Sequence, residues 1–493
     1  MPPGELAHKY AKSLLLCLPI YWQRLKGNCM TAHTKSSFAS KLGFVLATAG
    51  SAVGLGNLWR FPTVAAKDGG GLFLVIYLIL VFTLGYAIMT SEMALGRRTG
   101  LSALNAYKAA EPKFGFLGKL AFIVPSIILM YYVVIGGWVL EYLFVFVTGS
   151  GVDAAADGFF TSFITSPIAP VVFTLLFLAL TALIIAAGVQ KGIERSGKVL
   201  MPILIVLAIG IAIFSLTLST TDADGTTRTG LEGLSILVIP NLEGLTLSNL
   251  GRTIMDAVGQ AFFSLSLAMG IMVTYSSYMR KEDNLSKNAL QVIGIDTAVA
   301  FLAGVMIIPA VFVFTGTDGL SAAGPSLMFV SLPKVFAAMG PVGGVVGAAF
   351  FLMVTLAALT SCVSILEVVV AGCMEQTHMP RGKATTIGFL GAAVGAIVVC
   401  LGYTAFYFEL PLPNGSTAQI LDVFDYVTNS VLMPIIALIS CILFGWVLKP
   451  SWVTDEGEAD GQKFYFKRMF FALIRYVAPI LLVILLIQSA LGL

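Results

Sequence analysis

The sequence has little charge, little histidine and little cysteine, and each shortage excludes a class of protein. Charged residues make up 11% of its 493 positions, against roughly 25% in an average soluble domain. The net charge of +3 is too small to suggest a nucleic-acid partner. Three histidines and six scattered cysteines form neither a metal-ligand cluster nor a disulfide framework. Because no nucleophile–base pair is visible either, we expect that the protein is not an enzyme.

Apolar runs fill most of the chain, which is 58% hydrophobic with a mean hydropathy of +0.93. A membrane-spanning helix needs about 20 such residues. The sequence predicts eleven spans, at 42–66, 72–97, 117–147, 168–188, 198–219, 251–280, 289–315, 342–374, 385–404, 418–447 and 468–491. Arg and Lys gather in alternate loops, so the positive-inside rule places the N-terminus in the cytoplasm. We therefore expect an all-α, multi-pass protein of the cell inner (plasma) membrane.

The stretch from Gly50 to Asn57 interrupts the first span. Its glycines favour backbone that leaves helical geometry. At membrane depth, unwound backbone is tolerated only inside protein or beside a cavity. Arg60, just beyond, is a charge that lipid would not accept without a partner. This stretch therefore predicts a binding site inside the membrane.

A second interruption is predicted in span six, between Gly259 and Gly270, where serines alternate with apolar residues. On its own, this segment is equally consistent with ordinary small-residue helix packing. Spans one and six, however, each open a set of five helices. Paired interruptions at corresponding positions are typical of inverted-repeat transporters with a site at the midplane.

These residues resemble the neurotransmitter:sodium symporter family. The resemblance runs from about residue 35 to the end of the chain and rests on motifs in matching order, which are Gly54–Asn57 with Trp59–Pro62, Asp68–Gly71, Glu92–Gly96, Tyr131-Tyr132, Gly259-Gln260, Tyr278–Lys281 and Leu359–Ser361. It implies the LeuT-type fold, with five-plus-five inverted repeats, helices 1 and 6 interrupted at the midplane, and sodium-coupled uptake of amino acids or amines.

The same resemblance suggests how the chain is divided. We expect a cytoplasmic N-terminal tail over 1–34, whose first 29 residues could lie upstream of the true start at Met30 or form an interfacial helix. A transporter core would cover 35–447, with inverted repeats at about 40–220 and 250–447. A cytoplasmic loop and a peripheral eleventh helix would occupy 448–493.

Two sodium sites follow from the resemblance. The first would use Ala52, Asn57, Ser264 and Asp296. The second would use Gly50, Val53, Ala357, Thr360 and Ser361. Neutral oxygens suit a hard cation that must also leave, although hydroxyls such as that of Thr360 can also simply bond the preceding helical turn.

Asp296 departs from the best-known family pattern, which has Asn there. A carboxylate at membrane depth needs a cation or a proton, unless it lies at a helix start near the cytoplasmic surface. Ala300 is a second departure, because chloride-dependent members have Ser there and chloride-independent ones often have Glu. We hypothesise that Asp296 supplies the compensating charge and that chloride is not required.

The substrate carboxylate is expected at the N–H groups of Leu55 and Gly56, with the Tyr132 hydroxyl and the first sodium ion beside it. Gly54 stands where amine-transporting relatives carry Asp, which favours a substrate that brings its own carboxylate. Met269, an adaptable thioether, favours large hydrophobic or aromatic side chains, although it could equally be a core filler. The predicted substrate residues are Ser51, Ala52, Gly54, Leu55, Gly56, Ile128, Tyr132, Phe263, Ser264, Ser266, Met269, Ser361 and Ile365.

Gates are predicted on both sides of this site. Arg60 and Asp425 would pair on the outer side, above Tyr132 and Phe263. The inner gate would combine Lys35, Phe38, Ser277, Tyr278 and Glu375.

The predicted function is a sodium-coupled secondary active symporter, with about two sodium ions, that imports a neutral amino acid by alternating access. Three alternatives stay open: a symporter of the same fold for small aliphatic amino acids, one for amines or osmolytes, and a non-transporting nutrient sensor. The sequence identifies neither the amino acid nor the oligomeric state.

Overall fold

A computed structural model describes residues 37–221, 225–242, 245–413 and 415–491. The predicted tail over 1–34 and the gate residue Lys35 lie outside these ranges. In the described part, nine helices are long and apolar enough to cross a membrane, and the bent first pair makes a tenth. The helices α12 and α13, separated at 265–270, form the remaining predicted span. The eleven predicted spans therefore each correspond to a helix or a helix pair, within a few residues at most ends.

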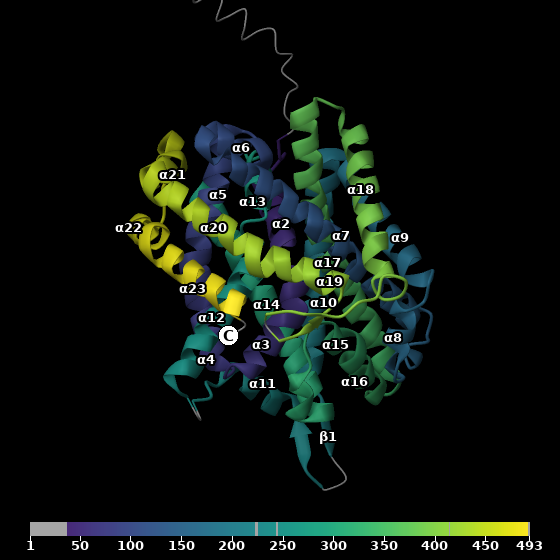
Figure 1. The fold of residues 1–493 in the computed structure, drawn as a ribbon. Helices are drawn as coiled ribbons and strands as arrows, with labels where there is room; N and C mark the ends of the chain where they lie inside the picture. The colour runs from purple at the N-terminus through teal and green to yellow at the C-terminus, as the bar shows by residue number, and fades with distance from the viewer. Residues whose placement is uncertain (1–36, 222–224, 243–244, 414, 492–493) are drawn as a thin grey trace, which may run out of the picture. The chain divides into compact units, whose positions relative to one another are not determined.

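The spans begin and end as follows: α2 Lys41–Ala52 with α3 Phe61–Lys67, α4 Gly71–Leu80 with α5 Tyr86–Thr99, α7 Gly115–Val147, α9 Ala169–Ala186, α10 Arg195–Leu216, α12 Leu247–Ser264 with α13 Ile271–Ser276, α14 Leu285–Thr315, α17 Pro341–Thr377, α18 Arg381–Leu401, α19 Ile420–Asp425 with α20 Met433–Ile442, and α22 Lys467–Ala472 with α23 Ala478–Leu491. Figure 1 shows these helices running through one bundle.

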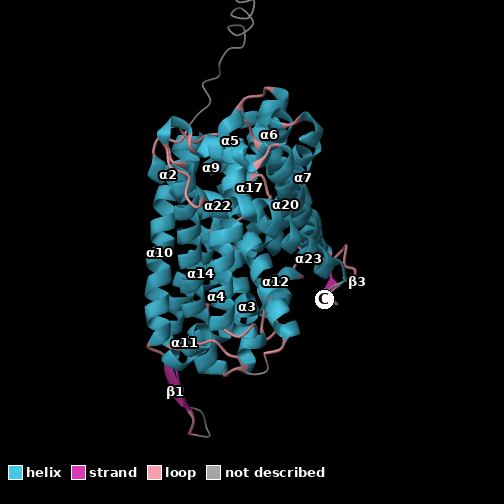
Figure 2. Cartoon of the chain, turned by 90° about the vertical axis from the view of Figure 1, so that its left-hand side faces the viewer, coloured by secondary structure: helices cyan, strands magenta, loops and turns pink. Residues whose placement is uncertain are grey.

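Short elements connect the spans. The helices among them are α6 Ala103–Ala110, α8 Phe159–Ile164, α11 Gly230–Val238, α15 Gly324–Ser326, α16 Leu332–Ala338 and α21 Pro450–Gly457. The strands β1 (Ser219–Thr221) and β2 (Thr227–Thr229) form an antiparallel hairpin with Ser219 opposite Thr229. This hairpin projects beyond the helices in Figure 2. A second antiparallel pair joins β3 (Leu410–Pro411) to β4 (Thr417–Ala418).

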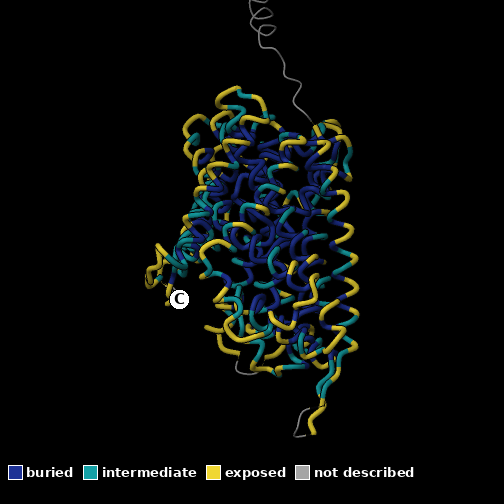
Figure 3. The backbone as a smooth tube through the Cα atoms, turned by 90° about the vertical axis from the view of Figure 1, so that its right-hand side faces the viewer, coloured by how far each residue is buried: buried dark blue, intermediate teal, exposed yellow. Residues whose placement is uncertain are grey.

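The outside of the bundle is apolar, as a bilayer requires. Leu183, Val206 and Val394 are about two-thirds exposed, at 67%, 68% and 66%. Figure 3 shows buried residues concentrated in the middle and exposed residues along the outside and at the ends. The helix α2 packs against α10, α14 and α17. This packing surrounds the first half of span one with protein, so its interruption is shielded from lipid.

Candidate substrate and ion site

Span one is broken where its glycines predict. The helix α2 ends at Ala52, and Val53 after it is extended, with φ −68° and ψ 105°. A π-helical turn, Gly56–Arg60, leads into α3, and the two halves are bent by 54°. The break therefore leaves irregular backbone between the two halves, deep in the bundle.

Span six is broken beside it. Between the end of α12 at Ser264 and the start of α13 at Ile271, Ser266 and Ala268 adopt left-handed φ values of 52° and 61°. Such backbone persists only where the surroundings hold it. The Ala268 N–H donates to buried Glu92 at 2.9 Å, and the Ser266 hydroxyl donates to the Ser51 carbonyl at 3.1 Å. The second contact joins the two breaks directly.

One cavity lies between the breaks. It is lined by all the predicted substrate residues except Ser264, together with two that the sequence analysis did not single out, Tyr131 and Asn429. Tyr131 lies next to Tyr132 on α7, and Asn429 lies one helical turn after Asp425. The chemistry of the lining, apolar side chains with a few hydroxyls and one amide, is that of a small-molecule site.

Gly54 has no room for a side chain. A Cβ there would lie 2.8 Å from the Ser361 hydroxyl and 3.0 Å from the Tyr132 hydroxyl. The Tyr132 hydroxyl also accepts the Leu55 N–H at 3.4 Å. The two hydroxyls and this N–H therefore converge on the part of the cavity where the substrate carboxylate is predicted.

The polar side chains of the predicted first sodium site come together from three helical segments. Asn57 Nδ2 donates to Asp296 Oδ1 at 2.8 Å and to the Ser264 hydroxyl at 3.0 Å. The Ser264 hydroxyl donates to Asp296 Oδ2 at 2.8 Å. A half-turn of the Asn57 amide would present its oxygen to the same point.

Asp296 lies well inside α14 and is completely buried, so it is not a helix-start residue near the surface. Within the described ranges, no cationic side chain lies within salt-bridge distance of it. Two neutral donors alone are poor compensation for a buried carboxylate, and this environment fits a small hard cation. Ala300, one turn further along α14, is also fully buried.

Residues of the predicted second site face each other across α2 and α17. The Ser361 hydroxyl donates to the Val53 and Ser51 carbonyls, each at 3.2 Å. The Thr360 hydroxyl donates to carbonyls of the preceding turn of its own helix, those of Leu356 at 3.1 Å and Ala357 at 3.0 Å. A Cβ on Gly50 would lie 3.2 Å from the Thr360 Cβ. Oxygen atoms of the set therefore gather beside the break, and their role stays a prediction.

On one side of the cavity, Arg60 and Asp425 line a second cavity. The Arg60 guanidinium lies 5.6 Å from the centre of the Phe263 ring. Asp425 accepts a hydrogen bond from Asn429 at 2.6 Å. In the part of the chain that the structure describes, Arg60 makes no ion pair within 4 Å, so the predicted pairing with Asp425 stays a prediction. We call this side the Arg60 side.

On the opposite side of the cavity, the Phe38 side chain is 1% exposed and is buried between helices. Its N–H donates to the Tyr278 carbonyl at 3.0 Å, and its ring packs on Phe44, Tyr275 and Tyr278. The predicted gate residue Glu375 accepts from the Ser102 N–H at 2.8 Å, at the start of α6. Its pairing with Lys35 stays a prediction, because Lys35 lies outside the described residues. We call this side the Phe38 side.

Three charged residues of the Phe38 side were not singled out for the gate. Glu194 accepts the Ala39 N–H at 2.6 Å and the Ser40 hydroxyl at 2.8 Å, which fixes the start of α2. Buried Glu367 accepts from the Tyr278 hydroxyl at 2.8 Å and pairs with Arg381. No local pattern in the sequence marks these three residues as neighbours of the gate.

The chain is similar to known proteins over most of its length. Residues 35–151 and 166–493 match the sodium:neurotransmitter symporter family. The uncharacterized sodium-dependent transporter YhdH of Bacillus subtilis is 36% identical over 464 residues, covering 92% of this chain and 98% of that protein. The sodium- and chloride-dependent GABA transporter 2 of Rattus norvegicus is 24% identical over 86% of this chain and 75% of its own length.

The crystal structure of MhsT in complex with L-phenylalanine superimposes with a TM-score of 0.80. It is 37% identical in sequence and covers 92% of this chain and 100% of its own.

Proposed function

The chain belongs to the sodium:neurotransmitter symporter family, and from this premise we propose that it imports neutral amino acids with large hydrophobic or aromatic side chains. Membership makes it a multi-pass, sodium-dependent symporter of the LeuT-type fold. The substrate class, the number of ions, the role of chloride and the orientation in the membrane belong to the proposal.

The observation that carries the proposal is the cavity between the two breaks. It offers a polar end, where the Tyr132 and Ser361 hydroxyls lie beside Gly54, and an apolar end that includes Ile128, Met269 and Ile365. A zwitterion with a bulky apolar side chain matches both ends. MhsT, which is similar over 92% of this chain, was crystallised with L-phenylalanine. An amine without a carboxylate would leave the polar end unpaired, a mismatch that binding sites penalise strongly.

Sodium would bind at both predicted sites. At the first, Asp296, Asn57 and Ser264 meet next to the polar end of the cavity, so the ion would lie against the substrate carboxylate. Ion and substrate would then each strengthen the binding of the other, which is the origin of coupling. With a zwitterionic substrate, two sodium ions carry two net charges, worth about 4.6 kcal/mol per 100 mV. This alone sustains a concentration ratio above a thousandfold, at roughly 1.4 kcal/mol per decade.

Chloride would not be required. The buried Asp296 carboxylate supplies one fixed negative charge beside the first ion, and Ala300 offers an anion neither a hydroxyl nor a positive charge. The relative from rat is described as chloride-dependent, so this chain would differ from it at this step.

The Arg60 side would face outward and the Phe38 side the cytoplasm, because the loops rich in Lys and Arg lie on the Phe38 side. Alternating access would then consist of closing Arg60 and Asp425 over the substrate while Phe38 leaves its position among Tyr275 and Tyr278. The membrane would be the cell inner (plasma) membrane.

Uptake into proteoliposomes tests the proposal. Purified protein is reconstituted, and uptake of each of the twenty labelled amino acids, GABA and a biogenic amine is measured with an inward sodium gradient and with potassium instead. We expect sodium-dependent uptake of Phe, Trp, Tyr and Leu, and at least tenfold less of glycine, GABA and the amine. Preference for an amine or for glycine would contradict the proposed substrate class, and binding without uptake would indicate a sensor.

A further inference from the structure

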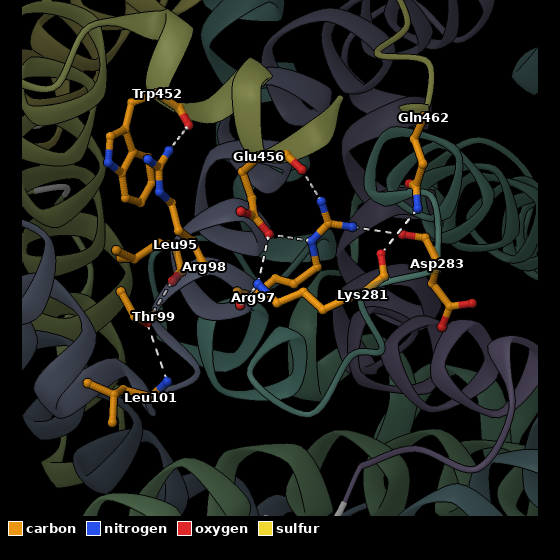
Figure 4. A network of polar contacts seen from close by, with 10 residues as sticks. All are labelled: Leu95, Arg97, Arg98, Thr99, Leu101, Lys281, Asp283, Trp452, Glu456 and Gln462. Atoms are coloured by element: carbon orange, nitrogen blue, oxygen red, sulfur yellow. Dashed lines mark hydrogen bonds and ion pairs between the residues drawn. The ribbon is translucent and has the colours of Figure 1, made fainter. Parts of the chain in front are cut away.

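A buried arginine joins three segments on the Phe38 side, outside the site described above. Arg97, in the last turn of α5, has a side chain that is 1% exposed. Its Nε donates to Glu456 Oε1 at 2.8 Å, its Nη2 donates to the Glu456 carbonyl, and its Nη1 donates to the Asp283 carbonyl at 2.7 Å. Figure 4 shows the guanidinium between Glu456 and Asp283. All three nitrogens of the planar guanidinium therefore donate hydrogen bonds.

The segments that meet there belong to different spans. Arg97 ends span two, and Asp283 lies in the loop that joins α13, the second half of span six, to α14. Glu456 lies on α21, in the loop between span ten and the last span. Lys281 adds a second cation, because its Nζ lies 3.5 Å from Glu456 Oε1 and donates to the Arg97 carbonyl at 3.2 Å.

The loop that carries Glu456 is joined to the Arg60 side by span ten and a short turn. Span ten is helical from Ile420 to Val447, and α21 begins at Pro450 after only two residues. Asp425 and Asn429, near the start of that helix, line the cavities on the Arg60 side. About 22 helical residues at 1.5 Å each separate Asp425 from Val447, or about 33 Å. Span ten and the two-residue turn at its end therefore form the direct covalent path from Glu456 to the residues opposite Arg60.

We propose that Arg97 and Glu456 are positioning residues of the transport cycle, which couple spans two and six to span ten and so to Asp425 at its far end. The inference rests on the proposed function in that the Arg60 side must open and close. It adds a link that neither gate contains, since among the described residues the side chains of Arg97 and Glu456 make their hydrogen bonds and ion pairs outside the cavity lining.

Neutral contacts dock the same loop independently of Arg97. The Gln462 side chain donates to the Lys281 carbonyl at 3.1 Å, and the Asn284 side chain donates to the Lys463 carbonyl at 3.0 Å. The Tyr465 N–H donates to the Ser286 hydroxyl at 3.0 Å. None of these contacts involves the guanidinium. We therefore expect an Arg97→Lys variant to keep the loop in place while it loses the hydrogen bonds of the planar guanidinium.

The test measures the accessibility of the Arg60 side after a change on the Phe38 side. Ser430, which lines the cavity shared by Arg60 and Asp425, is replaced as Ser430→Cys. The labelling rate with a membrane-impermeant maleimide is measured on the full chain in sodium and in potassium. The chain without this substitution measures reaction of its own six cysteines. Arg97→Lys and Glu456→Gln are added in turn. Lys467→Ala is the matched control, because it breaks an exposed ion pair of the same loop, to Glu458.

We expect the sodium-dependent change in labelling to shrink at least threefold in Arg97→Lys and Glu456→Gln and to stay unchanged in Lys467→Ala. Maximal uptake falls at least fivefold in both variants, while the substrate concentration for half-maximal uptake stays within twofold. Labelling and uptake equal to those of the control would overturn the inference, as would a loss of binding in parallel with uptake, which indicates a merely structural role.

If Arg97→Lys does not yield folded protein, Lys281→Ala replaces it, because Lys281 is 57% exposed. The sodium response of the parent chain tests the proposed function, and the difference between parent and variant tests this inference.

Discussion

The Asn57 amide nitrogen lies 2.8 Å from a carboxylate oxygen of Asp296, and this contact joins the break in span one to the middle of span seven. Both side chains are fully buried. Under the proposed function, a cation at this carboxylate would lie near the bound substrate carboxylate. This one negative charge would then bear on both the sodium affinity and the chloride requirement.

Asp296→Asn should therefore raise the sodium concentration for half-maximal uptake at least tenfold, which corresponds to about 1.4 kcal/mol. Adding Ala300→Glu should restore uptake in chloride-free buffer, because residues four apart on a helix are neighbours. Adding Ala300→Ser instead should give uptake that depends on chloride. Uptake is measured in sodium chloride and in sodium gluconate. A parent chain that loses uptake in gluconate would refute the compensating role of Asp296.

Gly54→Ala should weaken substrate binding by tenfold or more. Its Cβ would lie within 3.0 Å of two hydroxyls of the cavity, and overpacking of this kind typically costs about 1–3 kcal/mol. Gly210→Ala on α10 is the matched control, because a Cβ there meets nothing within 4 Å. Equilibrium binding of labelled substrate compares the two, and equal affinities would show that Gly54 does not border the substrate.

Met269→Phe should change the substrate preference with little effect on sodium. Met269 lines the cavity, and a rigid ring in place of the flexible thioether leaves less space for an aromatic substrate. We expect the ratio of Trp to Leu uptake to fall about tenfold, within the range of roughly 1–3 kcal/mol for changes in an apolar pocket. Met272→Leu, which is buried but outside the cavity lining, should leave the ratio unchanged. An unaltered ratio in Met269→Phe would mean that Met269 only fills core space.

Because of Asp68, which lies between spans one and two, the free energy of unfolding should decrease as the pH rises. The pKa of Asp68 is raised to about 7, chiefly by burial. A hydrogen bond to Asp256 and the negative charge of Asp256 contribute to the rise, while the positive charges of Lys67 and Arg252 oppose it. Between about pH 4 and pH 7 the folded chain thus binds more protons than the unfolded chain, so the free energy of unfolding decreases with pH across this window and levels off above it.

Thermal unfolding of Asp68→Asn measures this effect. The variant should be more stable than the parent at pH 8, with a difference that shrinks toward pH 4.5. Asp157→Asn is a contrasting control, because Lys334 lowers the pKa of that exposed carboxylate. A pH-independent difference between Asp68→Asn and the parent would contradict the assignment.

Local signals in the sequence were sufficient for the spans and for the interruption of span one, whereas the interruption of span six was predicted only from its correspondence with span one. Glycine spacing locates the break after Ala52, and apolar length locates helices such as α7 and α17. The resemblance to a family supplied positions such as Asp296 and Ser361, which the fold brings to the cavity or to Asn57.

Contacts between distant segments could not be predicted in this way. Glu194 binds the start of α2 across about 150 residues of sequence, and no local pattern marks it as a partner of Ala39. Glu375 is predicted to belong to the inner gate, and its carboxylate also accepts hydrogen bonds from Ser102, a distant contact that no local pattern indicates. Asn429 reaches the cavity because it lies one turn from Asp425, a spacing that gains meaning only once the direction of span ten is known.

Equilibrium binding of labelled L-phenylalanine to the purified protein tests the central claim most directly, because it reports the occupied cavity itself. The account predicts saturable binding in sodium chloride, unchanged affinity in sodium gluconate, no binding in potassium chloride, and at least tenfold weaker affinity in Asp296→Asn. Binding that is equally strong in potassium, or that disappears in gluconate, would contradict it.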